Sequence, residues 1–333
     1  MTAPLLQVEG LRTHFFTRTG VVKAVDDVSF TVGKGEVLGL VGESGSGKSM
    51  TAYSIMGLVD EPGRVVAGRV MFDGTDLLKQ PAETLRALRG SRIAMIFQDP
   101  MMTLNPVLSI ETQMIETVLA HRAVSRVVAR DRARAALARV GIPSPDERLR
   151  AYPHQFSGGM RQRVAIAIAL LNDPELIIAD EPTTALDVTI QGQILYEMQK
   201  LSRDTGAAMI WISHDLSVIA GLADRVCVMY AGRVVEEGAV GDVLRRPAHP
   251  YTRGLIDSVP SRVPRGTRLR SIPGMPPLVA TLSLACAFRE RCGSAINACV
   301  AAPESRPIGP TRGGRVVRCH NPLPLDELHH ENG

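Results

Sequence analysis

Apolar residues along this chain follow two patterns, which predict strands and helices in turn. Between residues 6 and 40, valines, leucines and a phenylalanine are interleaved with polar residues, as in half-buried antiparallel strands. Later apolar segments at 226–230 and 231–235 predict a hairpin. Four further short apolar runs have the length of buried strands. They are residues 37–41, 91–97, 176–180 and 208–212.

Residues 108–171 carry a different, helical pattern. Apolar side chains recur there at intervals of three and four residues, with arginines between many of them. Residues 141–145, Gly-Ile-Pro-Ser-Pro, interrupt this helical stretch. Because strands alternate with helices along the chain, we expect an α/β fold built on a mainly parallel sheet.

The stretch between the apolar run 37–41 and the helix expected after it has the form G-x-x-x-x-G-K-S. Its glycines let backbone N–H groups turn inward around a polyphosphate, and the helix N-terminus adds partial positive charge. We expect Lys48 to reach the β- and γ-phosphates and Ser49 to ligate Mg²⁺. A glycine-rich turn without a ligand is the alternative, but the position of the Lys-Ser pair favours ATP or GTP. The residues expected at the nucleotide are Gly42, Ser44, Gly45, Ser46, Gly47, Lys48, Ser49 and Met50.

Two later segments fit the same nucleotide site. Asp180 and Glu181 end the apolar run 176–180, where a Walker B pair is expected. Asp180 would hold Mg²⁺ through its water shell, and Glu181 would act as general base on the attacking water. The turn Ser157-Gly158-Gly159 opens an apolar helix and directs backbone N–H groups at an anion. Alone, each segment has a structural alternative, an acidic strand end or a plain turn.

The order of these motifs resembles the ATP-binding subunits of ABC transporters. Residues 156–160, Phe-Ser-Gly-Gly-Met, resemble the family signature Leu-Ser-Gly-Gly-Gln, with Phe and Met as departures. Gln98 matches the Q-loop, and residues 185–187, ending at Asp187, match the D-loop. Residues 213–215 match the switch-histidine loop through His214. The matching motifs run from residue 42 to residue 215.

The resemblance implies a fold and a set of roles. It implies a P-loop ABC-type nucleotide-binding domain over residues 1–245, with a RecA-like parallel core, N-terminal antiparallel strands and a helical insertion at about 100–171. Residues 246–333 would form a small, loop-rich C-terminal region. His214 would sense the γ-phosphate, and Gln98 would join the Mg²⁺ shell. Phe15 is preferred over Phe16 as the ring that stacks on adenine, with the other ring in the core.

The same resemblance implies that two such domains meet head to tail. Each ATP would lie between the phosphate-binding loop of one domain and Ser157, Gly158 and Gly159 of the other, and Asp187 would belong to this site. ATP binding would close the dimer, and hydrolysis would open it.

Residues 249–253, His-Pro-Tyr-Thr-Arg, narrow the resemblance to ATPases of oligopeptide, dipeptide and nickel importers. This resemblance implies import of di- or oligopeptides, with nickel or another small solute as alternatives. It also implies a second homologous ATPase, two transmembrane permease subunits and an extracytoplasmic solute-binding protein as partners. The chain would lie peripherally at the cytoplasmic face of the inner membrane.

Four of the five cysteines, Cys286, Cys292, Cys299 and Cys319, have the spacing C-x5-C-x6-C-x19-C. This spacing lacks the C-x2-C pairs of usual zinc sites. Resemblance to peptide importers implies a [4Fe-4S] cluster on these cysteines, with zinc or free buried thiols as alternatives. Cys227 lies in an apolar run and is expected in the core.

Composition adds limits to this picture. With 45% hydrophobic and 22% charged residues, the chain is an ordinary globular protein without a membrane-spanning run or an apparent secretory signal. A cytoplasmic chain is not expected to form structural disulfides. Residues 245–333 hold 13 Arg, no Lys and 6 acidic residues, which gives +7. A solvated surface explains this positive charge. The alternative is that the chain is a non-transport ABC ATPase that binds nucleic acid. We favour the solvated surface and therefore expect no nucleic-acid partner. A regulatory module with a dead ATP site is disfavoured by the intact motif residues.

Overall fold

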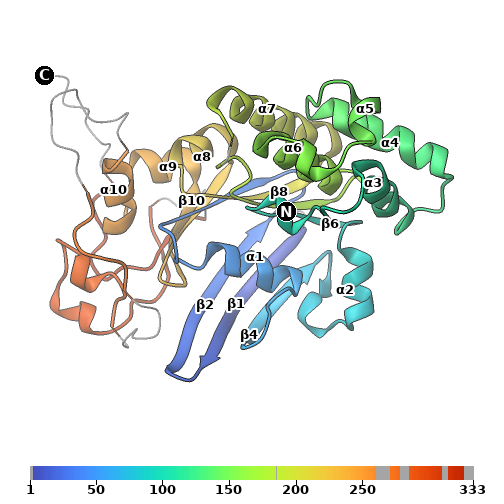
Figure 1. Cartoon of the computed structure of the whole chain (residues 1–333). Coiled ribbons are helices and arrows are strands. Elements are labelled where there is room, and N and C mark those ends of the chain that lie inside the picture. The colour runs from blue at the N-terminus through green and yellow to red at the C-terminus, as the bar shows by residue number, and fades with distance from the viewer. Residues whose placement is uncertain (1–2, 185, 260–270, 278–284, 310–313, 326–333) are drawn as a thin grey trace, which may run out of the picture. The chain divides into compact units, whose positions relative to one another are not determined.

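The computed structural model describes residues 3–184, 186–259, 271–277, 285–309 and 314–325 (Figure 1). Ala185, part of the expected D-loop, lies outside the described residues. By packing, the chain divides into two compact units. The first unit comprises Met1–Leu5, Val32–Val37 and Lys79–Ile212. The second comprises Leu6–Thr31, Leu38–Leu78 and Ser213–Gly333, so most of the C-terminal residues belong to the same unit as the phosphate-binding loop. The domain boundary expected near residue 245 stays a prediction.

The first unit is built on three parallel strands. Strand β6 (Ile93–Ile96) pairs with β7 (Leu176–Asp180), and β7 pairs with β8 (Ala208–Ser213). All their side chains are buried, which explains why these strands are continuous apolar runs in the sequence. The predicted parallel core is therefore confirmed in this unit, and the strands place their carboxyl ends at one edge.

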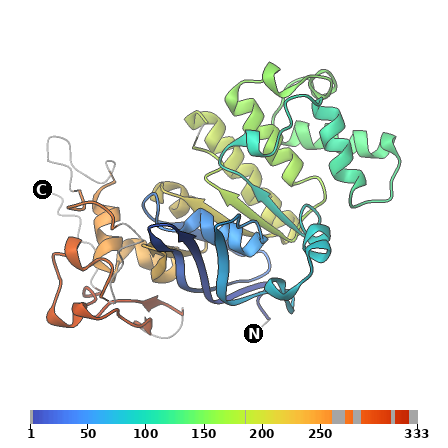
Figure 2. The same ribbon diagram turned by 60° about the horizontal axis from the view of Figure 1, so that its bottom comes forward.

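Helices make up most of the rest of the first unit, and the predicted helical insertion is confirmed. Serine caps begin two of these helices: Ser109 accepts from the Thr112 N–H, and Ser125 accepts from the Val128 N–H. Helices α3 to α6, in green, gather into one group (Figure 2). The helices are α2 (Ala82–Leu88), α3 (Ile110–Leu119), α4 (Arg126–Arg139), α5 (Pro145–Leu149), α6 (Gly158–Ala169) and α7 (Val188–Thr205), with 3-10 turns at Pro100–Met102 and Pro153–Gln155.

The second unit contains the predicted N-terminal antiparallel strands. They are arranged in the order β2 (Gly20–Val32), β1 (Leu6–Thr17), β4 (Gly63–Phe72) and β5 (Thr75–Asp76). Strands β1 and β4 are antiparallel, with Leu6 opposite Phe72. The long strands β1, β2 and β4 lie side by side near helix α1 (Figure 1).

A second group of strands in this unit carries both the phosphate-binding loop and the C-terminal tail. Strand β3 (Val37–Val41) is parallel to β9 (Arg225–Tyr230), and β9 forms the predicted hairpin with β10 (Arg233–Ala239). The short strand β12 (Val316–Val317) pairs with β10, and β11 (Arg306–Pro307) pairs with β12. The tail thus adds strands to the hairpin.

The helices of the second unit are short. They are α1 (Lys48–Met56), α8 (Leu216–Leu222), α9 (Val240–Arg245) and α10 (Pro250–Asp257), with 3-10 turns at Leu77–Lys79, Arg289–Arg291 and Asn297–Val300. In the part of the chain that the structure describes, no helix is both long and apolar enough to cross a membrane.

One buried carboxylate fixes the start of the C-terminal region. Glu236 on β10 is fully buried and pairs with Arg315 at 2.6 Å. Its two oxygens also accept the backbone N–H groups of Ala248 and His249, each at 2.9 Å. Because a buried charge is costly unless it is paired and hydrogen-bonded, this network ties the beginning of α10 to the hairpin.

Candidate functional site

The phosphate-binding loop joins β3 to α1, as its sequence predicts. The Lys48 side chain is buried and its ammonium donates to the Gly42 carbonyl at 2.8 Å and the Glu43 carbonyl at 2.9 Å. The N–H of Ser46 donates to the Glu43 carbonyl at 3.2 Å, and Ser49 and Met50 lie in the first turn of α1. The loop is therefore curled around the position from which Lys48 reaches a phosphate.

Glycine is required at both ends of this loop. Gly47, the residue before α1, has φ +100°, and a Cβ there would collide with the Ala24 carbonyl. A Cβ at Gly42 would collide with the Met229 carbonyl of β9. Backbone atoms of β2 and β9 thus lie too close to the loop for a side chain, and only glycine fits at these two positions. A loop of this tight shape around a buried lysine fits the phosphates of ATP.

The two candidate adenine-stacking rings lie on β1. Phe15 is half-buried, and its ring packs against the Cα side of Gly63. Phe16 is 40% exposed, with the Arg64 guanidinium 4.2 Å from the ring centroid. The expectation that one of the two rings belongs to the core is therefore wrong. Phe15 as the stacking ring stays a prediction.

One of the two acidic residues at the end of β7, Glu181, meets the Q-loop glutamine. Asp180 is the buried last residue of β7, and Glu181 follows it with a backbone N–H bonded to the Ile212 carbonyl at 3.0 Å. The Glu181 carboxylate accepts from Gln98 Nε2 at 3.4 Å and from Thr184 Oγ1 at 3.1 Å. Because Gln98 follows β6 and Glu181 follows β7, the parallel strands bring them to one edge. Thr184 is a partner that the sequence pattern did not single out.

The Ser-Gly-Gly turn and the D-loop aspartate each cap a helix. Ser157 Oγ accepts from the Met160 N–H at 3.3 Å at the start of α6, and Ser157 and Gly158 are exposed. Asp187 accepts from the Ile190 N–H at 3.0 Å at the start of α7. Phe156 is buried, so its replacement of the family leucine keeps an apolar core side chain. Exposed helix N-termini of this kind suit an anion brought by another molecule.

His214 lies in the second unit, directly after the end of β8, and its side chain is exposed. Asp215 beside it caps α8 by accepting from the Ser217 N–H at 2.7 Å. The switch-loop residues thus follow a strand, as the sequence predicts, and precede helix α8, which the sequence pattern did not predict. The role of His214 at the γ-phosphate stays a prediction.

The C-terminal region reaches the phosphate-binding loop at Glu43, a contact that sequence patterns did not predict. Arg291 forms a bidentate ion pair with the Glu43 carboxylate at 2.7 and 3.0 Å. The Tyr251 hydroxyl accepts the Glu43 N–H at 2.8 Å. The hydrogen bond to Glu43 raises the pKa of Arg291, and burial raises that of Tyr251, so both side chains stay protonated. Arg291 lies 248 residues from Glu43, so local patterns carry no sign of this pair.

The four C-terminal cysteines share one small region of the second unit as free thiols. The Cys286 N–H donates to the Cys299 carbonyl at 3.1 Å. Burial raises the pKa of Cys319 to about 11, and the other three thiols add to that shift. Among the described residues, no three His, Cys, Asp or Glu side chains converge closely enough to hold one metal ion. Cys227 is buried in β9, as predicted.

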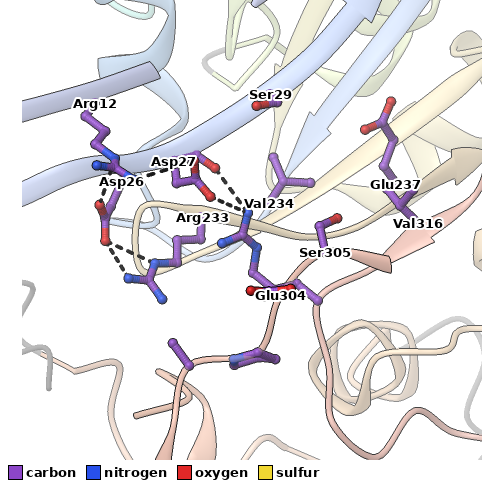
Figure 3. A pocket seen from close by; sticks show the side chains of 13 residues that line it. Arg12, Asp26, Asp27, Ser29, Arg233, Val234, Glu237, Glu304, Ser305 and Val316 are labelled. Carbon is purple, nitrogen blue, oxygen red and sulfur yellow. Dashed lines mark hydrogen bonds and ion pairs between the residues drawn. The ribbon is translucent and has the colours of Figure 1, made fainter. Parts of the chain in front are cut away.

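A cavity of about 500 Å³ in the second unit is lined by charged side chains of β1, β2, β10 and the tail (Figure 3). Arg233 binds Asp26 at 2.6 Å, and Arg318 of the tail binds Asp27 at 2.9 Å. Burial alone would raise the pKa of Asp26, but the hydrogen bond and charge of Arg233 outweigh it and lower the pKa. Arg12 completes the network, 3.7 Å from Asp26. The Arg318–Asp27 pair fastens the tail to β2, and the Asp26 pairs join β2 to β1 and β10.

The loop, the Asp-Glu strand end and the Ser-Gly-Gly cap on this α/β fold define a nucleotide-hydrolysing cassette of the ABC class. The family model for ABC transporters matches residues 25–184, and the model for the oligopeptide/dipeptide transporter C-terminal region matches residues 235–299. The oligopeptide transport ATP-binding protein OppD of Salmonella typhimurium is 46% identical over 96% of this chain and 94% of its own. The dipeptide transport ATP-binding protein DppD of Haemophilus influenzae is 46% identical over 96% of both chains.

A solved structure of an ATP-binding cassette is also similar to this chain. The ATP-binding cassette MJ0796, in a dimeric post-hydrolysis state with ADP and Pi, is 27% identical with a TM-score of 0.65. The match covers 71% of this chain and 98% of that one. The chain therefore belongs to the ABC transporter family of ATP-binding proteins and is an ATPase of that family. The predicted fold class is confirmed.

Proposed function

We propose that this chain is the ATPase subunit that powers import of di- and oligopeptides across the cytoplasmic membrane. The observation that carries the proposal is the near full-length identity of 46% to oligopeptide and dipeptide transport ATP-binding proteins. The match of residues 235–299 to the C-terminal region of such transporters supports it. Nickel or another small solute is the second candidate cargo.

In this proposal several of the described residues each have a separate role in ATP hydrolysis. Lys48 binds the β- and γ-phosphates in the loop, and Ser49 and Asp180 would hold Mg²⁺, with Gln98 in its shell. Glu181 accepts the proton of the attacking water, and its contact with Gln98 at 3.4 Å supports a shared position at the strand edge. His214 donates to the γ-phosphate, and Phe15 stacks on adenine.

The exposed caps of α6 and α7 support a dimeric mechanism. Ser157, Gly158 and Gly159 would bind the γ-phosphate held by the loop of a second ATPase, and Asp187 would lie at the same interface. The relative MJ0796 was solved as a dimer, which is consistent with this arrangement. The partners would be a second homologous ATPase, two permease subunits and an extracytoplasmic binding protein, with this chain peripheral at the cytoplasmic membrane face.

Uptake in a deletion strain tests the proposal. Labelled dipeptide and nickel uptake would be measured in the strain complemented with wild-type chain or with Lys48→Ala at equal expression. We expect dipeptide uptake with the wild type alone, because hydrolysis drives the transport cycle. Uptake of nickel but not of dipeptide would identify nickel as the cargo and would leave the proposed ATPase role unchanged. If neither solute responds, and binding to nucleic acid is salt-sensitive, the transport proposal fails.

We further propose that Cys286, Cys292, Cys299 and Cys319 bind a [4Fe-4S] cluster. One zinc ion would need four sulfurs at about 2.3 Å from a single point. In a four-iron cluster each cysteine binds a different iron, so the sulfurs gather without converging on one ion. The proposal rests on the resemblance to peptide importers and on the position of all four cysteines in the C-terminal part of the second unit. A bound cluster would staple this loop-rich region.

Metal analysis of anaerobically purified chain tests the cluster. We expect about four iron atoms and four acid-labile sulfides per chain, with the visible absorption of an iron–sulfur centre. Cys299→Ser should lose the iron, whereas Cys227→Ala, which changes the cysteine buried in β9, should keep it. Zinc in a one-to-one ratio would favour the alternative metal. The absence of both metals would leave four structural thiols.

A further inference from the structure

We propose that the C-terminal region holds the phosphate-binding loop in its nucleotide-binding shape. Arg291 is the positioning residue, and the Glu43 carboxylate is the loop group that it binds. The inference rests on the proposed function of the loop as the ATP site. It assigns to the C-terminal region a direct part in ATP affinity, through contacts that lie within the second unit.

The ion pair between Arg291 and Glu43 has the geometry of a fixed contact. Arg291 Nη1 donates to Glu43 Oε2 at 2.7 Å, and Nη2 donates to Oε1 at 3.0 Å. The Arg291 side chain is 6% exposed and that of Glu43 is 26% exposed, so water screens the pair little. Bidentate, charge-assisted pairs of this kind fix orientation as well as adding energy. A surface arginine would not constrain the loop in this way.

Glu43 is held at its backbone as well as at its side chain. The Tyr251 hydroxyl accepts the Glu43 N–H, and Lys48 donates to the Glu43 carbonyl. The residue that begins the turn of the loop is therefore fixed at three points. Two of these come from the C-terminal region, and one comes from the lysine expected to bind phosphate. The peptide orientation at Glu43 thus depends on groups about two hundred residues away in sequence.

Arg291 is itself held rigidly. Its Nε donates to the Pro273 carbonyl at 2.9 Å, and its Nη1 donates to the Tyr230 hydroxyl at 3.3 Å. Tyr230, Tyr251 and Phe288 form a buried aromatic cluster beneath it, with ring centroids 4.5 to 5.4 Å apart. Arg291 also ends the short turn that runs between Cys286 and Cys292. Arg291 therefore belongs to the cysteine-containing segment and at the same time binds the phosphate-binding loop.

A second segment of the C-terminal region lies beside the loop. Pro276 and Pro277 line a small cavity together with Ser44, Gly45 and Ser46. Ser44 and Gly45 are the exposed tip of the loop, where a free glycine-rich chain would be most mobile. Two separate segments of the C-terminal region, one with Arg291 and one with the two prolines, thus lie next to the loop.

The expected consequence is for ATP binding more than for the chemical step. The described hydrogen bonds of Arg291 are to the Glu43 carboxylate of the loop, the Tyr230 hydroxyl and the Pro273 carbonyl. Releasing Glu43 lets the loop sample shapes in which its N–H groups no longer converge, and the apparent affinity falls with the population of the competent shape. The KM for ATP should therefore rise, while kcat at saturating ATP stays near its wild-type value.

Arg291→Gln in the full chain tests the proposal. We expect the Kd for a fluorescent ATP analogue and the KM for ATP to rise roughly tenfold, as for loss of one charged hydrogen-bonded pair. kcat should change by less than about threefold. Arg291→Lys keeps the charge but not the fork, and should recover part of the affinity. Arg289→Gln is the matched control, because it removes an exposed arginine from the same turn.

A double-mutant cycle separates positioning from general destabilisation. Glu43→Gln should weaken ATP binding as Arg291→Gln does, and the double variant should be no worse than either single one. A lower melting temperature with an unchanged KM would overturn the proposal, as would additive effects. If Arg291→Gln does not fold, Glu43→Gln breaks the same pair from the loop side. Failure of the wild-type chain to bind ATP would reject the proposed function instead.

Discussion

Glu181→Gln is expected to reduce ATP turnover by about a hundred- to ten-thousand-fold, because the amide cannot accept the proton of the attacking water. The side chain keeps its size and its contacts with Gln98 and Thr184. ATP binding should therefore survive. Since hydrolysis is what opens the dimer, the variant should accumulate as an ATP-bound dimer. Phosphate release measures turnover, and light scattering with and without ATP measures dimerisation.

The matched control is Glu83→Gln, an exposed carboxylate in the first turn of α2. It should hydrolyse ATP at the wild-type rate. Near-normal activity in Glu181→Gln would reject Glu181 as the base. Loss of ATP binding in that variant would instead assign Glu181 a part in holding the nucleotide.

Lys48→Ala should abolish both binding and hydrolysis of ATP. The ammonium is buried inside the loop and already spans the Gly42 and Glu43 carbonyls, so its removal deletes the main positive charge of the cradle. Loss of one preorganised donor to a reacting phosphate costs about a hundred- to a thousand-fold in rate. Isothermal titration with Mg-ATP and steady-state hydrolysis would measure the two losses separately.

Lys200→Ala, which changes an exposed lysine near the end of α7, is the control for charge alone. It should bind and hydrolyse ATP normally. Wild-type affinity in Lys48→Ala would contradict the placement of the phosphates in this loop. An unfolded variant would be recognised by its melting curve and replaced by Lys48→Met, which fills the same space.

Several parts of this protein follow from local sequence, because the interactions that form them are local. The G-x-x-x-x-G-K-S stretch after an apolar run becomes a loop and a helix N-terminus here, and Gly47 adopts the left-handed backbone that glycine tolerates best. Ser157 and Asp187 cap helices through bonds to residues three positions away. The continuous apolar runs become buried parallel strands because both faces are covered.

The meeting of Gln98 with Glu181 is an intermediate case. Each residue follows a recognisable strand, but their contact depends on β6 and β7 being neighbours in the sheet. Local patterns predict two strand ends and cannot say which strands pair. The two phenylalanines illustrate the same limit, since an alternating strand pattern did not tell that both rings stay outside the core.

Sequence by itself determined the phosphate-binding loop, the acidic strand end and the helix that Ser157 opens, because each rests on short-range backbone geometry. The class of fold followed from the alternation of strands and helices along the chain. Only the tertiary structure decided that Arg291 and Tyr251 hold Glu43 and that Glu236 anchors the start of α10. These contacts join residues far apart along the chain. Their energy comes from burial and charge pairing that exist only once the strands and the tail have packed together.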